Sequence, residues 1–99
     1  MIVHIPCKDE REAKRIASHL LKKRLIACAN MFPIDSIYRW KGKTVKDKET
    51  VLIAKSVSSK WNPIRKEVNE LHSYECPCIE RINVQWNKPY ADWVRSEVR

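Results

Sequence analysis

Cysteine and histidine side chains are the groups in this sequence best suited to bind a metal ion. Cysteine occurs at positions 7, 28, 76 and 78, and His72 precedes the last two of these thiols. Thiolate and imidazole ligands suit Cu(I) or Zn²⁺. If the first and last strands lie side by side, Cys7, His72, Cys76 and Cys78 form a soft-metal cluster. The alternative is that Cys76 and Cys78 fill small apolar positions, since free cysteine behaves as a compact hydrophobe.

The remaining cysteine and the other histidines have weaker ligand patterns. Cys28 lies in the apolar run 25–31, so we expect it in the core. His4 and His19 have no ligand partner close in sequence, and we expect half-buried or surface imidazoles. We find no C-x-x-C spacing, nucleophile elbow, phosphate loop or carboxylate pair at catalytic spacing. The sequence therefore predicts no enzyme activity and no obligatory cofactor.

Length and hydropathy point to one domain, residues 1–99, because a chain of 99 residues has no room for two independent cores. The amino-terminal segment MIVHIPCKDE lacks a basic stretch followed by a long apolar run. No segment approaches the roughly 18 apolar residues of a membrane span. We therefore expect a soluble, cytosolic protein with free thiols and no membrane partner.

A formal net charge of +8 raises the possibility of a nucleic-acid partner. The basic residues are interleaved with acidic ones in 11–24, 39–48 and 60–66, a pattern typical of a solvated surface. An RNA-recognition motif needs stacking aromatic residues on its two central strands. Neither Ile2–Pro6 nor Glu49–Ser56 contains one, so we expect no nucleic-acid partner.

Apolar periodicity and turn residues predict seven elements in the order β-α-β-β-α-β-α. The strands are expected at Ile2–Pro6, at Leu25–Lys41, at Val45 with Glu49–Ser56, and at Cys78–Trp86. The helices are expected at Glu10–Arg24, from a Ser58 or Ser59 cap to about His72, and from an Asn87 cap through Val98.

With right-handed crossovers, this order predicts a ferredoxin-like βαββαβ sandwich with strand order 4-1-3-2 and a C-terminal helix. Both main helices then cover one face of the sheet. The second and third strands form a long hairpin that turns at Gly42 and bends near Pro33. We expect the terminal helix and a partner subunit to cover the other face.

Three segments resemble the CutA divalent-cation-tolerance family. The stretch RLIACANMFPIDSIYRWKGKTVKDKETVLIAKS, residues 24–55, has the family's ACAN, its W-x-G-K hairpin tip and its apolar strand ending in Lys. The segment ELHSYECP is similar to the family's H-x-Y-x-x-P, and residues 90–93 are similar to its Y-x-x-W. The segments occur in the family's order over nearly the whole chain.

The resemblance implies a divalent-cation-tolerance protein that forms a homotrimer, with hairpin strands pairing across subunits. It implies that Trp40 anchors an interface; the alternative is a tryptophan packed on its own subunit. Polar and aromatic positions are implied to gather at an intersubunit cleft, as a small-anion site, a proton-transfer site or a salt-bridge network. They are Tyr38, Trp40, Glu49, Lys55 and Tyr74, with His72 nearby.

The resemblance also implies binding of copper or another divalent metal. The copper site proposed in the family uses a first-strand cysteine, whose position here is about Ile5, and histidines before the tyrosine, of which His72 is present. Cys7 lies two residues from Ile5 on the same side of the strand. The alternative function is a PII-like trimeric sensor of small ligands that uses the intersubunit cleft.

Overall fold

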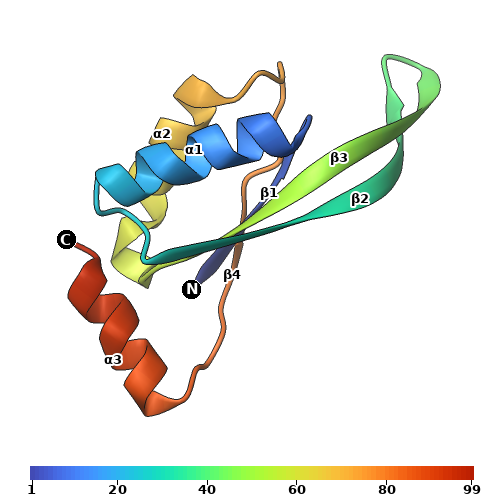
Figure 1. Cartoon of the computed structure of the whole chain (residues 1–99). Helices are drawn as coiled ribbons and strands as arrows, with labels where there is room; N and C mark the ends of the chain where they lie inside the picture. The colour runs from blue at the N-terminus through green and yellow to red at the C-terminus, as the bar shows by residue number, and fades with distance from the viewer.

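The computed structural model describes residues 1–99 as a mixed α/β protein built on one four-stranded antiparallel sheet (Figure 1). The elements are β1 (Ile2–Cys7), α1 (Glu10–Lys22), β2 (Cys28–Trp40), β3 (Lys43–Lys55), α2 (Trp61–Leu71), β4 (Glu80–Ile82) and α3 (Lys88–Glu97). The strand order is β2-β3-β1-β4, which confirms the predicted 4-1-3-2. None of the helices is long and apolar enough to cross a membrane.

The core lies between one face of the sheet and the two helices α1 and α2. Odd-numbered residues of β1 are buried and even-numbered ones are half-buried, because successive side chains of a strand point to opposite faces. The helices contribute apolar residues at steps of three and four. The largest buried core side chains are Val3, Ile5, Ile16, Leu20, Ile26, Leu52, Ile64 and Val68. We call the face of the sheet that α1 and α2 cover the helix face, and the other face of the sheet the open face.

Helix α1 ends at Lys22, two residues before the predicted end at Arg24. Arg24 has a φ of 60°, the left-handed conformation in which a helix cannot continue. Its N–H donates to the carbonyl of Leu21, and the N–H of Leu25 donates to the carbonyl of Leu20. This pair of hydrogen bonds is a Schellman motif, here with arginine at the position that usually holds glycine.

The hairpin of β2 and β3 is much longer than the rest of the sheet (Figure 1). Its ladder runs without interruption from Cys28 opposite Lys55 to Trp40 opposite Lys43, through Pro33. The two-residue turn between the strands has positive φ at Lys41 (49°) and at the adjacent glycine (80°), as a type I′ turn requires.

The length of β1 divides this hairpin into two parts. β1 pairs only with Thr50–Lys55 of β3. Residues 34–49 therefore form a two-stranded ribbon, which we call the distal ribbon, in a molecule that measures 45 × 25 × 21 Å.

Strand β4 has three residues, whereas the sequence predicted a strand over Cys78–Trp86. Its only neighbour is β1, and Ile2 at the start of β1 already lies opposite Ile82. Residues after Ile82 have no strand beside them. At the other end, the register places Pro6 near Cys78, and proline has no N–H to extend the ladder.

The other two helices begin without the predicted side-chain caps. A 3₁₀ turn at Ser58–Lys60 leads into α2, and the Asn87 side chain caps no N–H of α3. Helix α3 lies at one end of the open face, where the Lys55 ammonium is 5.2 Å from the Tyr90 ring centre. The terminal helix therefore covers that end of the open face.

We predict that Arg24→Gly stabilises the protein by about 1 kcal/mol, because glycine adopts the left-handed conformation without steric cost. The change also removes the Arg24 Nε, which is buried without a hydrogen bond. Arg24→Ala is the matched control, since it removes the same side chain and keeps the backbone strain. Urea unfolding should rank glycine above alanine, and equal stabilities of the two variants would contradict this explanation.

Candidate functional site

The thiols that the sequence predicted to form one cluster lie on opposite faces of the sheet. Cys7 points to the helix face and is fully buried. Cys78 is exposed and lies with His4 and Glu80 on the open face. The structure therefore does not bring Cys7, His72, Cys76 and Cys78 into one cluster. Instead it forms two groups of possible ligands, one on each face.

The buried group contains Cys7, Glu12 and His72, whose potential ligand atoms lie within 4.8 Å of one another. Nε2 of His72 lies 2.9 Å from the Pro6 carbonyl oxygen, and the Tyr74 N–H donates to Nδ1 at 3.1 Å. Because a carbonyl only accepts and an amide N–H only donates, the imidazole is neutral with its proton on Nε2. Both of its nitrogens are thus occupied.

The Glu12 carboxylate and the Cys7 thiol also have hydrogen-bond partners within the protein. The Glu12 carboxylate accepts hydrogen bonds of 3.0 Å from the N–H groups of Lys8 and Ser73. Burial raises the pKa of Glu12, but these hydrogen bonds outweigh it and hold the pKa below its usual value. Burial, followed by the Glu12 charge, raises the pKa of Cys7 to about 12, so its thiol keeps its proton. A metal ion bound here would have to replace all of these interactions. The group therefore has a structural role: it connects the end of β1, the start of α1 and the segment after α2.

Four of the five predicted cleft residues line one pocket of about 440 Å³. Tyr38, Trp40 and Glu49 come from the hairpin, and Tyr74 comes from the segment after α2. The Tyr74 hydroxyl donates to Glu49 Oε2 at 2.7 Å. Burial and this carboxylate raise the pKa of Tyr74, so the phenol stays protonated. The remaining wall is formed by Pro6, Ser73, Glu75, Cys76 and Cys78.

The fifth predicted cleft residue, Lys55, does not line this pocket. It lies at the opposite end of β3, six residues from Glu49, beside Tyr90. Six residues of extended strand span about 20 Å. The two positions therefore belong to different regions of the molecule.

The other cysteine and histidine positions are also placed by the structure. Cys28 is half-buried at the start of β2, and Cys76 is exposed at the rim of the pocket. His19 lies between α1 and α2, with its Nε2 2.8 Å from Glu67. Lys23 donates to the same carboxylate, so this imidazole belongs to a helix-helix ion-pair network.

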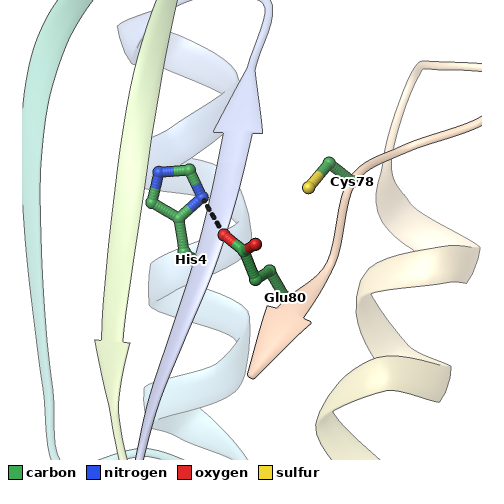
Figure 2. Close-up of side chains that lie close together, drawn as sticks. All are labelled: His4, Cys78 and Glu80. Carbon is green, nitrogen blue, oxygen red and sulfur yellow. Dashed lines mark ion pairs between the residues drawn. The ribbon is translucent and has the colours of Figure 1, made fainter. Parts of the chain in front are cut away.

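The second group of possible ligands consists of His4, Cys78 and Glu80 (Figure 2), with ligand atoms within 4.8 Å of one another. Partial burial, then the Glu80 charge, raises the pKa of the Cys78 thiol. Sequence reasoning missed His4 and Glu80 because they are 76 positions apart. The alternation of β1 was the available signal for His4. Since the buried Val3 and Ile5 point to the helix face, His4 between them points to the open face.

We predict that Glu12→Gln lowers the free energy of unfolding at pH 7 by about 1–3 kcal/mol, because it weakens two hydrogen bonds to a buried carboxylate. The folded-state pKa of Glu12 is lowered, so its stabilisation is complete above the unfolded value of 4.5 and is lost as the pH falls through the folded value. The difference from wild type should therefore shrink below about pH 4.5. Chemical unfolding across pH measures it, with the exposed Glu10→Gln as control. A deficit that does not change with pH would rule out the charged carboxylate as its source.

Comparisons with known proteins agree over the length of the chain. The model of the CutA1 divalent ion tolerance protein family matches residues 1–97. The divalent-cation tolerance protein CutA of Archaeoglobus fulgidus is 40% identical over 97 residues, which are 97% of this chain and 95% of the relative.

Solved structures have the same fold. That of the periplasmic divalent cation tolerance protein CutA from Archaeoglobus fulgidus has a TM-score of 0.96 at 39% identity, over 99% of this chain and 97% of that one. The PII-like protein CutA from Nostoc sp. PCC 7120, in apo form, has a TM-score of 0.91 at 29% identity, over 100% and 98%. Since the solved Archaeoglobus fulgidus protein is described as periplasmic, a cytosolic location of this chain stays a prediction. The family match and the relatives confirm the predicted resemblance, and this chain belongs to the CutA1 divalent ion tolerance protein family.

Proposed function

We propose that this chain acts in divalent-cation tolerance as a non-catalytic homotrimer of ferredoxin-like subunits that binds copper or another divalent cation. The observation that carries the proposal is the distal ribbon, residues 34–49. It extends beyond β1 and has no third strand beside it. An isolated two-stranded ribbon is marginally stable in water, so it needs a partner surface.

The side chains of the hairpin support assembly. Ile37 is 71% exposed, and Phe32, Tyr38 and Trp40 are 40–48% exposed, which places four large apolar or aromatic groups on one extended element. Both edges of the ribbon carry backbone groups without a strand partner, and proteins cover such edges. Strands of neighbouring subunits would pair with these edges and bury the apolar side chains. Aromatic residues such as Trp40 are frequent interface anchors.

The basic surface fits this proposal without a nucleic-acid partner. Several of the lysines form exposed ion pairs with acidic residues of the same subunit. These pairs are Lys14–Glu10, Lys23–Glu67, Lys48–Asp35 and Lys88–Asp92. The positive charge is therefore partly compensated over the surface. We also propose a cytosolic location, where a reducing environment keeps the four cysteines as free thiols, including the exposed Cys76 and Cys78.

We predict that Ile37→Asp weakens assembly, because a charge would be buried at the subunit interface. Leu21→Asp is the matched control, since Leu21 is a 41%-exposed aliphatic residue on α1, outside the hairpin. Light scattering coupled to size-exclusion chromatography should give a trimer mass for wild type and for Leu21→Asp, and a smaller mass for Ile37→Asp. A monomeric wild type at micromolar concentration would contradict the proposal, as would an Ile37→Asp trimer of unchanged stability.

A second candidate function is sensing of a small ligand in the pocket between the hairpin and residues 73–78. The pocket volume of about 440 Å³ lies in the usual range for small-molecule sites. The Glu49 carboxylate and the Tyr74 hydroxyl provide polar groups among aromatic walls. The similarity to a protein described as PII-like favours this candidate.

We predict that a ligand of this pocket raises the melting temperature, since a ligand that binds only the native state stabilises it. A thermal-shift screen of nucleotides and small acids tests this candidate. For any hit, Tyr74→Phe should reduce the shift, because it removes the hydroxyl and keeps the ring. Tyr90→Phe on α3 serves as the control. A screen without hits, or a shift unchanged by Tyr74→Phe, would count against the sensor.

A further inference from the structure

The pairing of β1 with β4 places two possible metal ligands directly opposite each other on the open face. His4 and Glu80 are register partners in this antiparallel pair. Opposite residues of a ladder point to the same face, so both side chains leave the sheet together. Cys78 precedes Glu80 by two residues, and Figure 2 shows its thiol directed toward the other two groups.

The imidazole of His4 has an unused nitrogen in this group. Its Nδ1 is buried and makes no hydrogen bond. Glu80 Oε1 lies 3.3 Å from it, close enough for an ion pair but without hydrogen-bond alignment. Buried polar atoms without a partner are rare in folded proteins, and each calls for an explanation. A bound cation would provide the missing partner.

The distances and exposures suit a three-ligand site. Zn²⁺ binds nitrogen and oxygen at about 2.0–2.2 Å and sulfur at about 2.3 Å, so tetrahedral ligand atoms lie about 3.3–3.8 Å apart. The three ligand atoms here lie within 4.8 Å of one another. Rotation of the exposed Cys78 and Glu80 side chains, the latter 54% exposed, can close this gap without moving the sheet.

The chemistry of the ligands selects the kind of ion. A thiolate, a carboxylate and a neutral imidazole carry two negative charges, which balance one divalent cation. Sulfur and imidazole nitrogen favour Zn²⁺ and Cu²⁺ over Mg²⁺ and Ca²⁺, which prefer oxygen ligands. Three protein ligands leave a fourth position open to water, as in sites where the metal exchanges ligands. Cys78 also lines the pocket described above, which gives the ion a route of entry.

We propose that His4, Cys78 and Glu80 bind a divalent cation of the Zn²⁺ type at the edge of the open face. The inference rests on the cation binding in the proposed function and assigns it to residues outside the buried group. That group, Cys7, Glu12 and His72, has its lone pairs and donors occupied. On binding, the Cys78 S–H bond breaks, the proton passes to the buffer and the thiolate sulfur forms the bond to the metal.

Calorimetric titration of the reduced, metal-free full-length protein with ZnCl₂ tests the site. We expect one Zn²⁺ per chain, release of one proton seen by comparing buffers of different ionisation enthalpy, and no competition from millimolar Mg²⁺. His4→Gln, Cys78→Ser and Glu80→Gln should each weaken binding by at least about tenfold. The matched controls His19→Gln, Cys76→Ser and Glu75→Gln should not change it. Circular dichroism verifies that each variant is folded.

Substitution with Co²⁺ gives an independent readout in the wild type. A thiolate-to-Co²⁺ charge-transfer band should appear, should persist in Cys76→Ser and should disappear in Cys78→Ser. Absence of Zn²⁺ binding by the wild type would overturn this site. The cation binding of the proposed function would be overturned only if Cu²⁺, titrated in the same way, also fails to bind. Zn²⁺ binding that is lost in a control variant, or kept in His4→Gln and Cys78→Ser, would overturn only the site. The oligomer mass is measured separately, so failure of assembly is distinguishable from either result.

Discussion

Strand β3 is the element on which both halves of the molecule depend, because its two neighbours differ greatly in length. β1 pairs with Thr50–Lys55 alone, whereas β2 accompanies β3 over all of Lys43–Lys55. The shared half lies under α1 and α2 and contributes to the core, while the other half forms the distal ribbon. A single strand thus joins a domain with its own core to a projecting two-stranded ribbon, and an isolated ribbon of this kind is only marginally stable in water.

The same sheet separates two kinds of chemistry. On the helix face, low dielectric and complete hydrogen bonding hold Cys7 protonated and Glu12 charged, which ties the end of β1 to the start of α1 and to the segment after α2. On the open face, His4 and Glu80 meet without a hydrogen bond beside an exposed thiol. The polar atoms of the first group have hydrogen-bond partners within the chain. The second still has bonding capacity, which is what a metal site requires.

Most of the fold follows from local sequence patterns. The apolar spacing of α1 and α2, the β-formers of the hairpin and the single glycine at its tip predicted the element order and the strand order. The sequence misplaced the ends of two elements, β4 and α1. β4 stops at Ile82 because β1 offers no further partner, and α1 stops at Lys22 because Arg24 adopts a left-handed conformation. Neither of these two ends is marked by the residue types at that position.

The sequence by itself determined the family and the donor types, because the family's motifs are short segments that can be read along the chain. Tyr38, Trp40, Glu49 and Tyr74 line one pocket, and their role in an intersubunit cleft stays a prediction. Only the tertiary structure decided which donors meet. A strand alternates its side chains between faces, so Cys7 at the end of β1 and Cys78 just before the neighbouring β4 can still point to opposite sides. Which face each side chain occupies depends on where the helices pack and on the register of β1 with β4. That register brings His4 to Glu80, 76 positions away.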